Sequence, residues 1–196
     1  VRAWTQEELS RRSGYSIRVI RKAESGGTLR IATLQHLCEA FSQERGTVKV
    51  EHLTCSLLSI AKEFLTAYDL HGVRMLDYCG HLLTDDFCYH IHADTTVFPY
   101  AGRWVGKDGM QEFLNKFHHM FQRRPGILKP TFLEGENRIH ARFLDQAFYK
   151  GEETPPIYIN LHFQFRNSLI CHLDNEFDSD LASNSIQSIS ERVAKA

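Results

Sequence analysis

Apolar residues in the first 41 positions recur at helical spacing and predict three short helices. The first follows Thr5, with Glu8 completing a capping-box pattern, and ends at Gly14, a residue that accepts a left-handed backbone. Residues 17–25 form the second helix, with a narrow apolar side, and residues 30–43 form the third. The pattern therefore predicts a small all-α unit.

Later in the chain the pattern changes from helical spacing to the two-residue alternation of strands. Helical spacing runs from position 48 to Gly72 with no Pro/Gly/Ser linker, and it returns at 108–121. Strands are predicted at 87–93, 127–133, 138–149, 157–166 and 169–177. Residues 178–196 are polar and Ser-rich and indicate a weak helix or a mobile tail. Helices followed by a meander of antiparallel strands predict an α+β fold.

The second predicted helix carries three cations, Arg18, Arg21 and Lys22, away from its apolar side. Arginine and lysine can donate to guanine edges or phosphates, and the helix start, capped by Ser16, favours an anion. A helical hairpin with a solvated basic face is the alternative, and charge alone would favour it. The combination of turn, caps and spacing favours a helix that enters the major groove of DNA.

Residues 4–41, WTQEELSRRSGYSIRVIRKAESGGTLRIATLQHLCEAF, resemble the Cro/cI repressor type of helix-turn-helix, the XRE family. The TQEEL opening, the SGYS turn and the TLxxLxxA pattern carry the resemblance. The family has a helix before this motif where only three residues stand here, so its first helix is expected to be missing. The resemblance implies DNA contacts by six residues: Gln6, Ser16, Ile17, Arg18, Arg21 and Lys22.

A second stretch, residues 61–178, resembles the SnoaL-like, nuclear transport factor two-like superfamily. FxxxYxxHG at 64–72, LTDDF at 83–87 and FPYAGRWVGKDG at 98–109 carry this resemblance. It implies a curved sheet wrapped by helices into a cone, a pocket at the wide end, and a tendency to form homodimers through the sheet. The superfamily contains cyclases, isomerases, dehydratases and non-enzymatic modules, among which the fold does not decide.

The expected organisation has four parts: a helix-turn-helix DNA-binding domain at 1–46, a helical connection at 47–60, the cone domain at 61–178 and a polar tail at 179–196. Charge supports it, since residues 1–45 hold 8 Lys and Arg against 5 Asp and Glu, and the remainder holds 15 against 19. Five widely spaced cysteines without a CxxC pair indicate reduced thiols in a cytoplasmic protein. No apolar run reaches the ~18 residues of a membrane span.

Candidate chemistry centres on the strand at 87–93. Alternation places Tyr89 and Ile91 on the face expected to line the pocket, and His90 and His92 on the opposite face. The position where an isomerase-type relative carries its base then falls on Ile91, which cannot accept a proton. A slip of one residue would turn the histidines inward.

Five residues are candidates for the pocket lining, with core packing as the alternative for each: Tyr89, Ile91, Tyr100, Trp104 and Tyr149. His90 and His92, with His162 and His172 on later strands, are candidates for a metal site. Because 11 histidines produce such pairs by chance, we interpret them as polar sheet-face or dimer-contact residues. The sequence thus predicts no metal, no cofactor and no catalytic residue.

Three functional hypotheses follow. The favoured one is a transcriptional regulator that binds duplex DNA, forms a homodimer through the cone domain, senses a small apolar ligand there, and is not an enzyme. The alternative is a cyclase or isomerase-type enzyme fused to a DNA-binding segment, which needs a carboxylate or histidine pointing into the cone beside a hydroxyl donor. The third is a dimerisation module whose cone is filled by its own Phe side chains.

Overall fold

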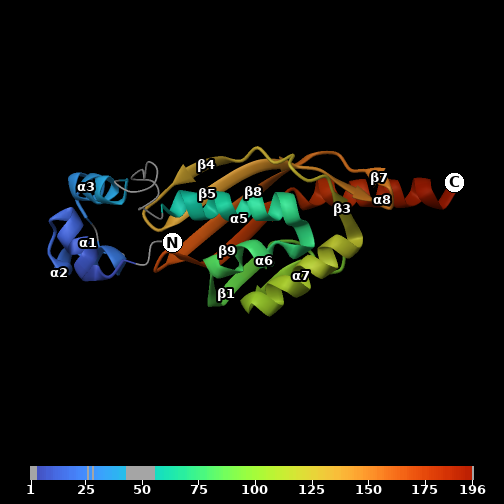
Figure 1. Cartoon of the computed structure of the whole chain (residues 1–196). Helices are drawn as coiled ribbons and strands as arrows, with labels where there is room; N and C mark the ends of the chain where they lie inside the picture. Colours follow the sequence, from blue (N-terminus) through green and yellow to red (C-terminus); the bar gives the residue numbers. More distant parts are fainter. Residues whose placement is uncertain (1–3, 26, 28, 43–55, 196) are drawn as a thin grey trace. The chain divides into compact units, whose positions relative to one another are not determined.

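The computed structural model describes residues 4–25, 27, 29–42 and 56–195, and the chain forms two compact units, Val1–Ser56 and Leu57–Ala196 (Figure 1). Most of the expected connection at 47–60 lies outside the described residues, as do the three residues before the helix-turn-helix motif.

The N-terminal unit contains the three predicted helices, α1 (Gln6–Ser13), α2 (Ile17–Glu24) and α3 (Ile31–Ser42). Thr5 caps α1 by accepting a hydrogen bond from the backbone N–H of Glu8 at 3.2 Å. Gly14 ends α1 with φ of 72°, in the left-handed region that favours glycine. Apolar side chains between the helices, Ile20 and Leu37 among them, are buried and form the interior of this unit.

The C-terminal unit combines helices with two sheets. Its helical elements are α5 (Leu57–His71), η1 (Gly72–Arg74), α6 (Leu76–Cys79), η2 (Gly80–Leu82), α7 (Gly106–Met120) and α8 (Ser179–Lys195). Its strands are β1 (Leu83–Ile91), β2 (Gly102–Val105), β3 (Phe121–Arg123), β4 (Thr131–Glu134), β5 (Arg138–Asp145), β6 (Ala147–Tyr149), β7 (Glu152–Glu153), β8 (Ile157–Arg166) and β9 (Leu169–Phe177). The chain is thus α+β, and the prediction of a small helical part followed by a cone is confirmed.

The larger sheet has the strand order β2-β1-β9-β8-β5-β4, and β3-β6-β7 form a smaller one. The bounds of β8 and β9 agree with the sequence, where alternation is strong and a short turn joins the strands. The expected all-antiparallel meander differs at β1, which begins at Leu83 and pairs with β9 in parallel. A parallel partner must come from a distant part of the chain, so local pattern does not reveal it.

The large sheet has an inner face toward the core and an outer face on the opposite side. Phe87, Ile139 and Phe163 point inward and are fully or almost fully buried. Helices α5, α6 and α7 lie along one side of this sheet in Figure 1. The two-residue alternation of the strands therefore assigns apolar residues to the core, and the outer face carries histidines and other polar residues together with exposed Leu133, Leu144 and Tyr158.

Residues 179–195 form the 17-residue helix α8. Of the two alternatives for this segment, a weak helix or a mobile tail, the structure shows the helix. Its Ile189 is 2% exposed, and Ser190 contacts the hydroxyl of Tyr149 at 3.4 Å. Arg192 on the same helix reaches Glu152 of β7, also at 3.4 Å. Among the described helices of both units, none is both long and apolar enough to cross a membrane.

Candidate functional site

A cavity of about 90 Å³ lies between the inner face of the sheet and helices α5, α7 and α8. Its wall is mostly aromatic and aliphatic, with contributions from both ends of the unit's sequence. Its apolar lining includes Phe64, Phe98, Phe113, Phe117, Phe121, Phe143, Leu161, Phe177 and Ile186. An apolar pocket with few polar groups is the usual form of a small-molecule site.

The polar groups in this wall are three tyrosines, an aspartate, a glutamine, an asparagine, a threonine and a serine. Asn175 donates from Nδ2 to the hydroxyl of Tyr89 at 2.7 Å. Its Oδ1 is buried and has no hydrogen-bond partner among the described residues. An unpaired buried acceptor is costly, so this atom marks a place where a ligand donor would be stabilising.

Asp145, at the end of β5, is the one charged residue among the described residues that line the cavity. Arg123 of β3 donates to it from Nε at 2.9 and 3.0 Å and from Nη2 at 2.8 Å. The Arg123 side chain is 3% exposed and lies 4.4 Å from the ring centre of Tyr68. Asp69 of α5 stands 3.7 Å from the same guanidinium. The cavity thus holds a carboxylate fixed by a buried cation.

Burial governs the protonation of these groups. It raises the pKa of Asp145, and the charge and hydrogen bonds of Arg123 oppose that rise. Burial also raises the pKa of Tyr68, Tyr89 and Tyr100, and the Asp145 charge adds to the rise in each case. The three tyrosines are therefore neutral hydroxyls near one carboxylate. Neutral hydroxyls can donate to a carbonyl oxygen while the carboxylate accepts a proton.

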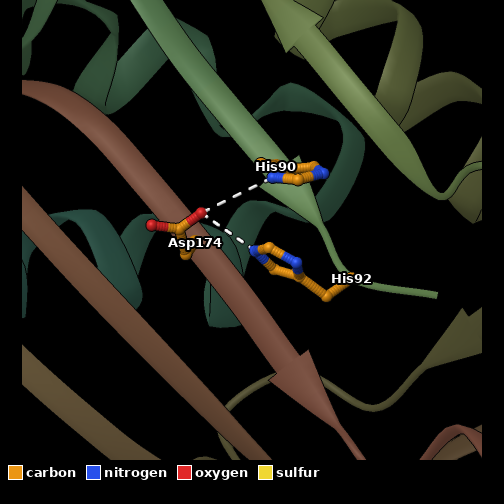
Figure 2. Close-up of side chains that lie close together, drawn as sticks. All are labelled: His90, His92 and Asp174. Carbon is orange, nitrogen blue, oxygen red and sulfur yellow. Dashed lines mark hydrogen bonds and ion pairs between the residues drawn. The ribbon is translucent and has the colours of Figure 1, made fainter.

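The outer face of the sheet carries a second polar group, drawn in Figure 2. His90 of β1 lies opposite Asp174 of β9 in the parallel register, and His92 follows β1 directly. Asp174 Oδ1 is 3.7 Å from His90 Nδ1 and 3.1 Å from His92 Nε2. His172 Nε2 is 3.1 Å from the other oxygen, Oδ2. All three histidines therefore meet one carboxylate.

Of the predicted pocket residues, Tyr89 and Tyr100 line the cavity, whereas Ile91 lies buried in the surrounding core. Trp104 donates its indole N–H to the carbonyl of Tyr100 and packs on the core from outside the lining. Tyr149 also lies outside the lining, where its hydroxyl meets α8.

Sequence reasoning missed the carboxylate. Asp145 continues the inward series Ile139, Ala141 and Phe143 at two-residue spacing, so alternation alone places it on the inner face. Its partner Arg123 lies 22 positions away on another sheet, and no local pattern joins the two.

In the N-terminal unit, Ser16, Arg18, Arg21 and Lys22 are exposed along α2 and just before it, and Ile17 is half-buried. Gln6 donates to Glu24 and accepts from Arg21 Nε at 3.0 Å, which ties α1 to α2. The six predicted contact residues thus include two that hydrogen-bond each other.

The C-terminal unit is similar in fold to solved NTF2-like structures at low sequence identity. An NTF2-like protein of unknown function from Burkholderia pseudomallei K96243 has a TM-score of 0.58 and 17% identity, covering 66% of this chain and 96% of that one. A "putative isomerase" from Rhodopseudomonas palustris has a TM-score of 0.55 and 15% sequence identity, and the match covers 67% of this chain and 96% of that one. A "putative polyketide cyclase" from Xanthomonas campestris pv. campestris has a TM-score of 0.54 and 12% sequence identity, and the match covers 66% of this chain and 96% of that one. No protein-family model and no curated protein matches the sequence.

These likenesses establish the NTF2-like, SnoaL-like fold of the C-terminal unit. They also correct one prediction: the exclusion of enzymatic activity is overturned, because solved structures of this fold carry the names "putative isomerase" and "putative polyketide cyclase". The exclusion rested on Ile91, where a base was expected on β1. The cavity instead receives its carboxylate from β5, as Asp145, beside hydroxyl donors.

Proposed function

We propose that the C-terminal unit is an enzyme of the cyclase or isomerase type. Its substrate is a small, mostly apolar compound that carries a carbonyl group, and its reaction is a proton transfer next to that carbonyl. The observation that carries this proposal is Asp145, a single buried carboxylate in an aromatic cavity beside neutral tyrosine hydroxyls.

In this mechanism Asp145 is the general base. Its Oδ1 accepts from Arg123 Nε, Arg123 Nη2 and the backbone N–H of Gln146, whereas within the described part of the chain Oδ2 accepts only from Arg123 Nε at 3.0 Å. Oδ2 is thus the freer oxygen to take a proton from the carbon beside the carbonyl. The two electrons of that C–H bond form a C=C bond to the carbonyl carbon, and the π pair of the C=O bond moves to the oxygen, which tyrosine hydroxyls stabilise as it becomes negative. The proton then returns from Asp145 to carbon, at the same position or another one.

Exchange of the α-protons of cyclohexanone with D2O, followed by proton NMR, tests this chemistry with a defined probe. The protein should accelerate exchange above the buffer rate, and Asp145→Asn should remove about 10²–10⁴-fold of the acceleration, the usual share of a general base. The matched control is Asp77→Asn, an aspartate with 60% side-chain exposure on α6, which should exchange as the unmodified protein does.

Asp145→Asn leaves a buried guanidinium with a weaker partner, so a folding defect must be separated from lost chemistry. Tyr89→Phe keeps the Arg123 pair and removes one hydroxyl from the cavity. It should slow exchange while the circular dichroism spectrum is unchanged. Equal exchange rates in the unmodified protein and both cavity variants would overturn the proposal.

For the N-terminal unit we propose duplex DNA binding through α2, with two copies of the chain presenting two such helices about 34 Å apart. Arg18 and Lys22 are exposed and stand four residues apart, so they share one side of the helix. The turn at Gly14 and the capped start of α1 are consistent with a helix-turn-helix of the XRE type.

Fluorescence anisotropy with a randomised duplex pool, enriched over several rounds, tests this second function. Arg18→Ala should weaken binding to the selected duplex by about 1–3 kcal/mol and relax the sequence preference at one base pair. Arg21→Ala should weaken binding to all duplexes alike, and the slope of log affinity against log salt concentration should become shallower by about one unit. Exposed Lys195→Ala on α8 serves as the charge-matched control. Unchanged affinity in both arginine variants would exclude α2 as the reading helix.

A further inference from the structure

The histidine and aspartate side chains on the outer face of the sheet form a compact donor set that the proposed reaction does not use. His90, His92 and Asp174 each offer one ligand atom, and these atoms all lie within 4.8 Å of one another (Figure 2). The donors come from β1, the residue directly after it and β9, on the face opposite the cavity. The set is therefore separate from Asp145 and its tyrosines.

The spacing of these atoms approaches that of a metal site. Ligand bonds of about 2.0–2.2 Å in a tetrahedron place neighbouring donor atoms about 3.4 Å apart. The distances from Asp174 Oδ1 are 3.1 Å to His92 Nε2 and 3.7 Å to His90 Nδ1, on either side of that value. The side chains of His90 and His92 are 38% and 44% exposed, so solvent leaves their rings room to rotate toward a bound ion.

The backbone holds the donors in place. His90 and His92 are two residues apart and share a strand face, and their rings lie 3.9 Å apart. The ladder continues past β1, since His92 donates its backbone N–H to the carbonyl of Asn175 at 3.0 Å. Asp174 is opposite His90 in the same ladder. Three donors on two hydrogen-bonded strands lose little freedom when they bind an ion.

We propose that His90, His92 and Asp174 bind a divalent transition-metal ion, with Zn²⁺ as the probe for this class. Two imidazoles and one carboxylate are a donor set that such ions accept, and an open position remains for water. His172 completes the arrangement as a positioning residue, because its Nε2 meets the second oxygen of Asp174 and orients the carboxylate.

Isothermal titration of the full chain with ZnCl2 tests this site. One equivalent should bind, and His90→Ala, His92→Ala and Asp174→Asn should each weaken that binding by tenfold or more. His172→Gln should weaken it by about 10–100-fold, as partners of ligating groups usually do. The visible absorption of Co²⁺, which reports coordination geometry, should appear in the unmodified protein and vanish in His92→Ala.

Two controls separate this site from adventitious binding to other histidines. His81→Gln and His119→Gln change exposed histidines on η2 and α7, outside the donor set, and both variants should bind Zn²⁺ as the unmodified protein does. The proposal is overturned by absence of binding at micromolar Zn²⁺, by equal binding in Asp174→Asn, or by sedimentation showing a homodimer whose formation blocks Zn²⁺ uptake.

Discussion

The inner and outer faces of the large sheet each hold an aspartate among partners of opposite character. Asp145 on the inner face is buried and held by the guanidinium of Arg123. Asp174 on the outer face is 22% exposed and held by the imidazoles of His92 and His172. A guanidinium has no lone pair, whereas a neutral imidazole offers one to a metal. The inner carboxylate is thus suited to proton transfer and the outer one to metal binding.

The pKa values of the two aspartates also differ between the inner and outer faces. Burial raises the pKa of Asp145, and Arg123 does not fully offset it. At Asp174 burial also raises the pKa, but hydrogen bonds from His92 and His172 outweigh it, and the net pKa is lowered. The pKa values of these two aspartates on one sheet are therefore shifted in opposite directions by their neighbouring groups.

The largest expected contrast comes from adjacent residues of β8 that face opposite ways. Phe163 is fully buried, and Phe163→Ala should cost about 3–5 kcal/mol through lost burial and a cavity. His162 is 41% exposed, and His162→Ala should change stability by less than about 0.5 kcal/mol. Urea unfolding followed by Trp104 fluorescence in a Trp4→Phe background measures both in the C-terminal unit. Equal costs would mean that the two faces are not inner and outer.

A smaller contrast compares the two aspartates. Asp145→Asn weakens charge-assisted hydrogen bonds to buried Arg123 and should cost about 2–3 kcal/mol. Asp174→Asn weakens pairs that reach solvent and should cost less than about 1 kcal/mol. The same urea assay compares them. A larger cost for Asp174→Asn would reverse the assignment of the faces.

Tyr89→Phe should have a smaller effect still. The change removes the acceptor of Asn175 Nδ2 and should cost about 1 kcal/mol, because a buried donor then loses its partner. The matched control is Tyr158→Phe on the outer side of β8, where the tyrosine is 49% exposed. In thermal unfolding, the midpoint temperature should be lower for Tyr89→Phe than for the unmodified protein and unchanged for Tyr158→Phe.

The pH dependence should be the smallest contrast, and its sign differs between the faces. Asp174 has a folded pKa below 3.8, so its stabilisation is present above 3.8 and is lost as pH falls through the folded value. Asp145 has a folded pKa above 3.8, so stability present below 3.8 is lost as pH rises through the raised value. Carboxyl carbon NMR titration should give the higher midpoint for Asp145. The reverse order would contradict the roles assigned to Arg123 and to the histidines.

Local pattern alone determined much of this protein. The N-cap at Thr5, the turn at Gly14 and the bounds of β8 and β9 follow from residues close together in sequence. The inward and outward faces of β1 also follow, because strand alternation needs no distant partner. Both the α+β fold and the outward position of the histidines were within reach of the sequence.

Tertiary structure decided the rest, since each decisive contact joins distant segments. His92 and Asp174 are 82 positions apart and meet only because β1 and β9 pair in parallel. Arg123 and Asp145 are 22 positions apart and meet between the two sheets. Helix α8 lines part of the cavity although its own sequence is polar enough to suggest a tail. Burial and pairing set the chemistry of a carboxylate, and both depend on which strands the fold brings together.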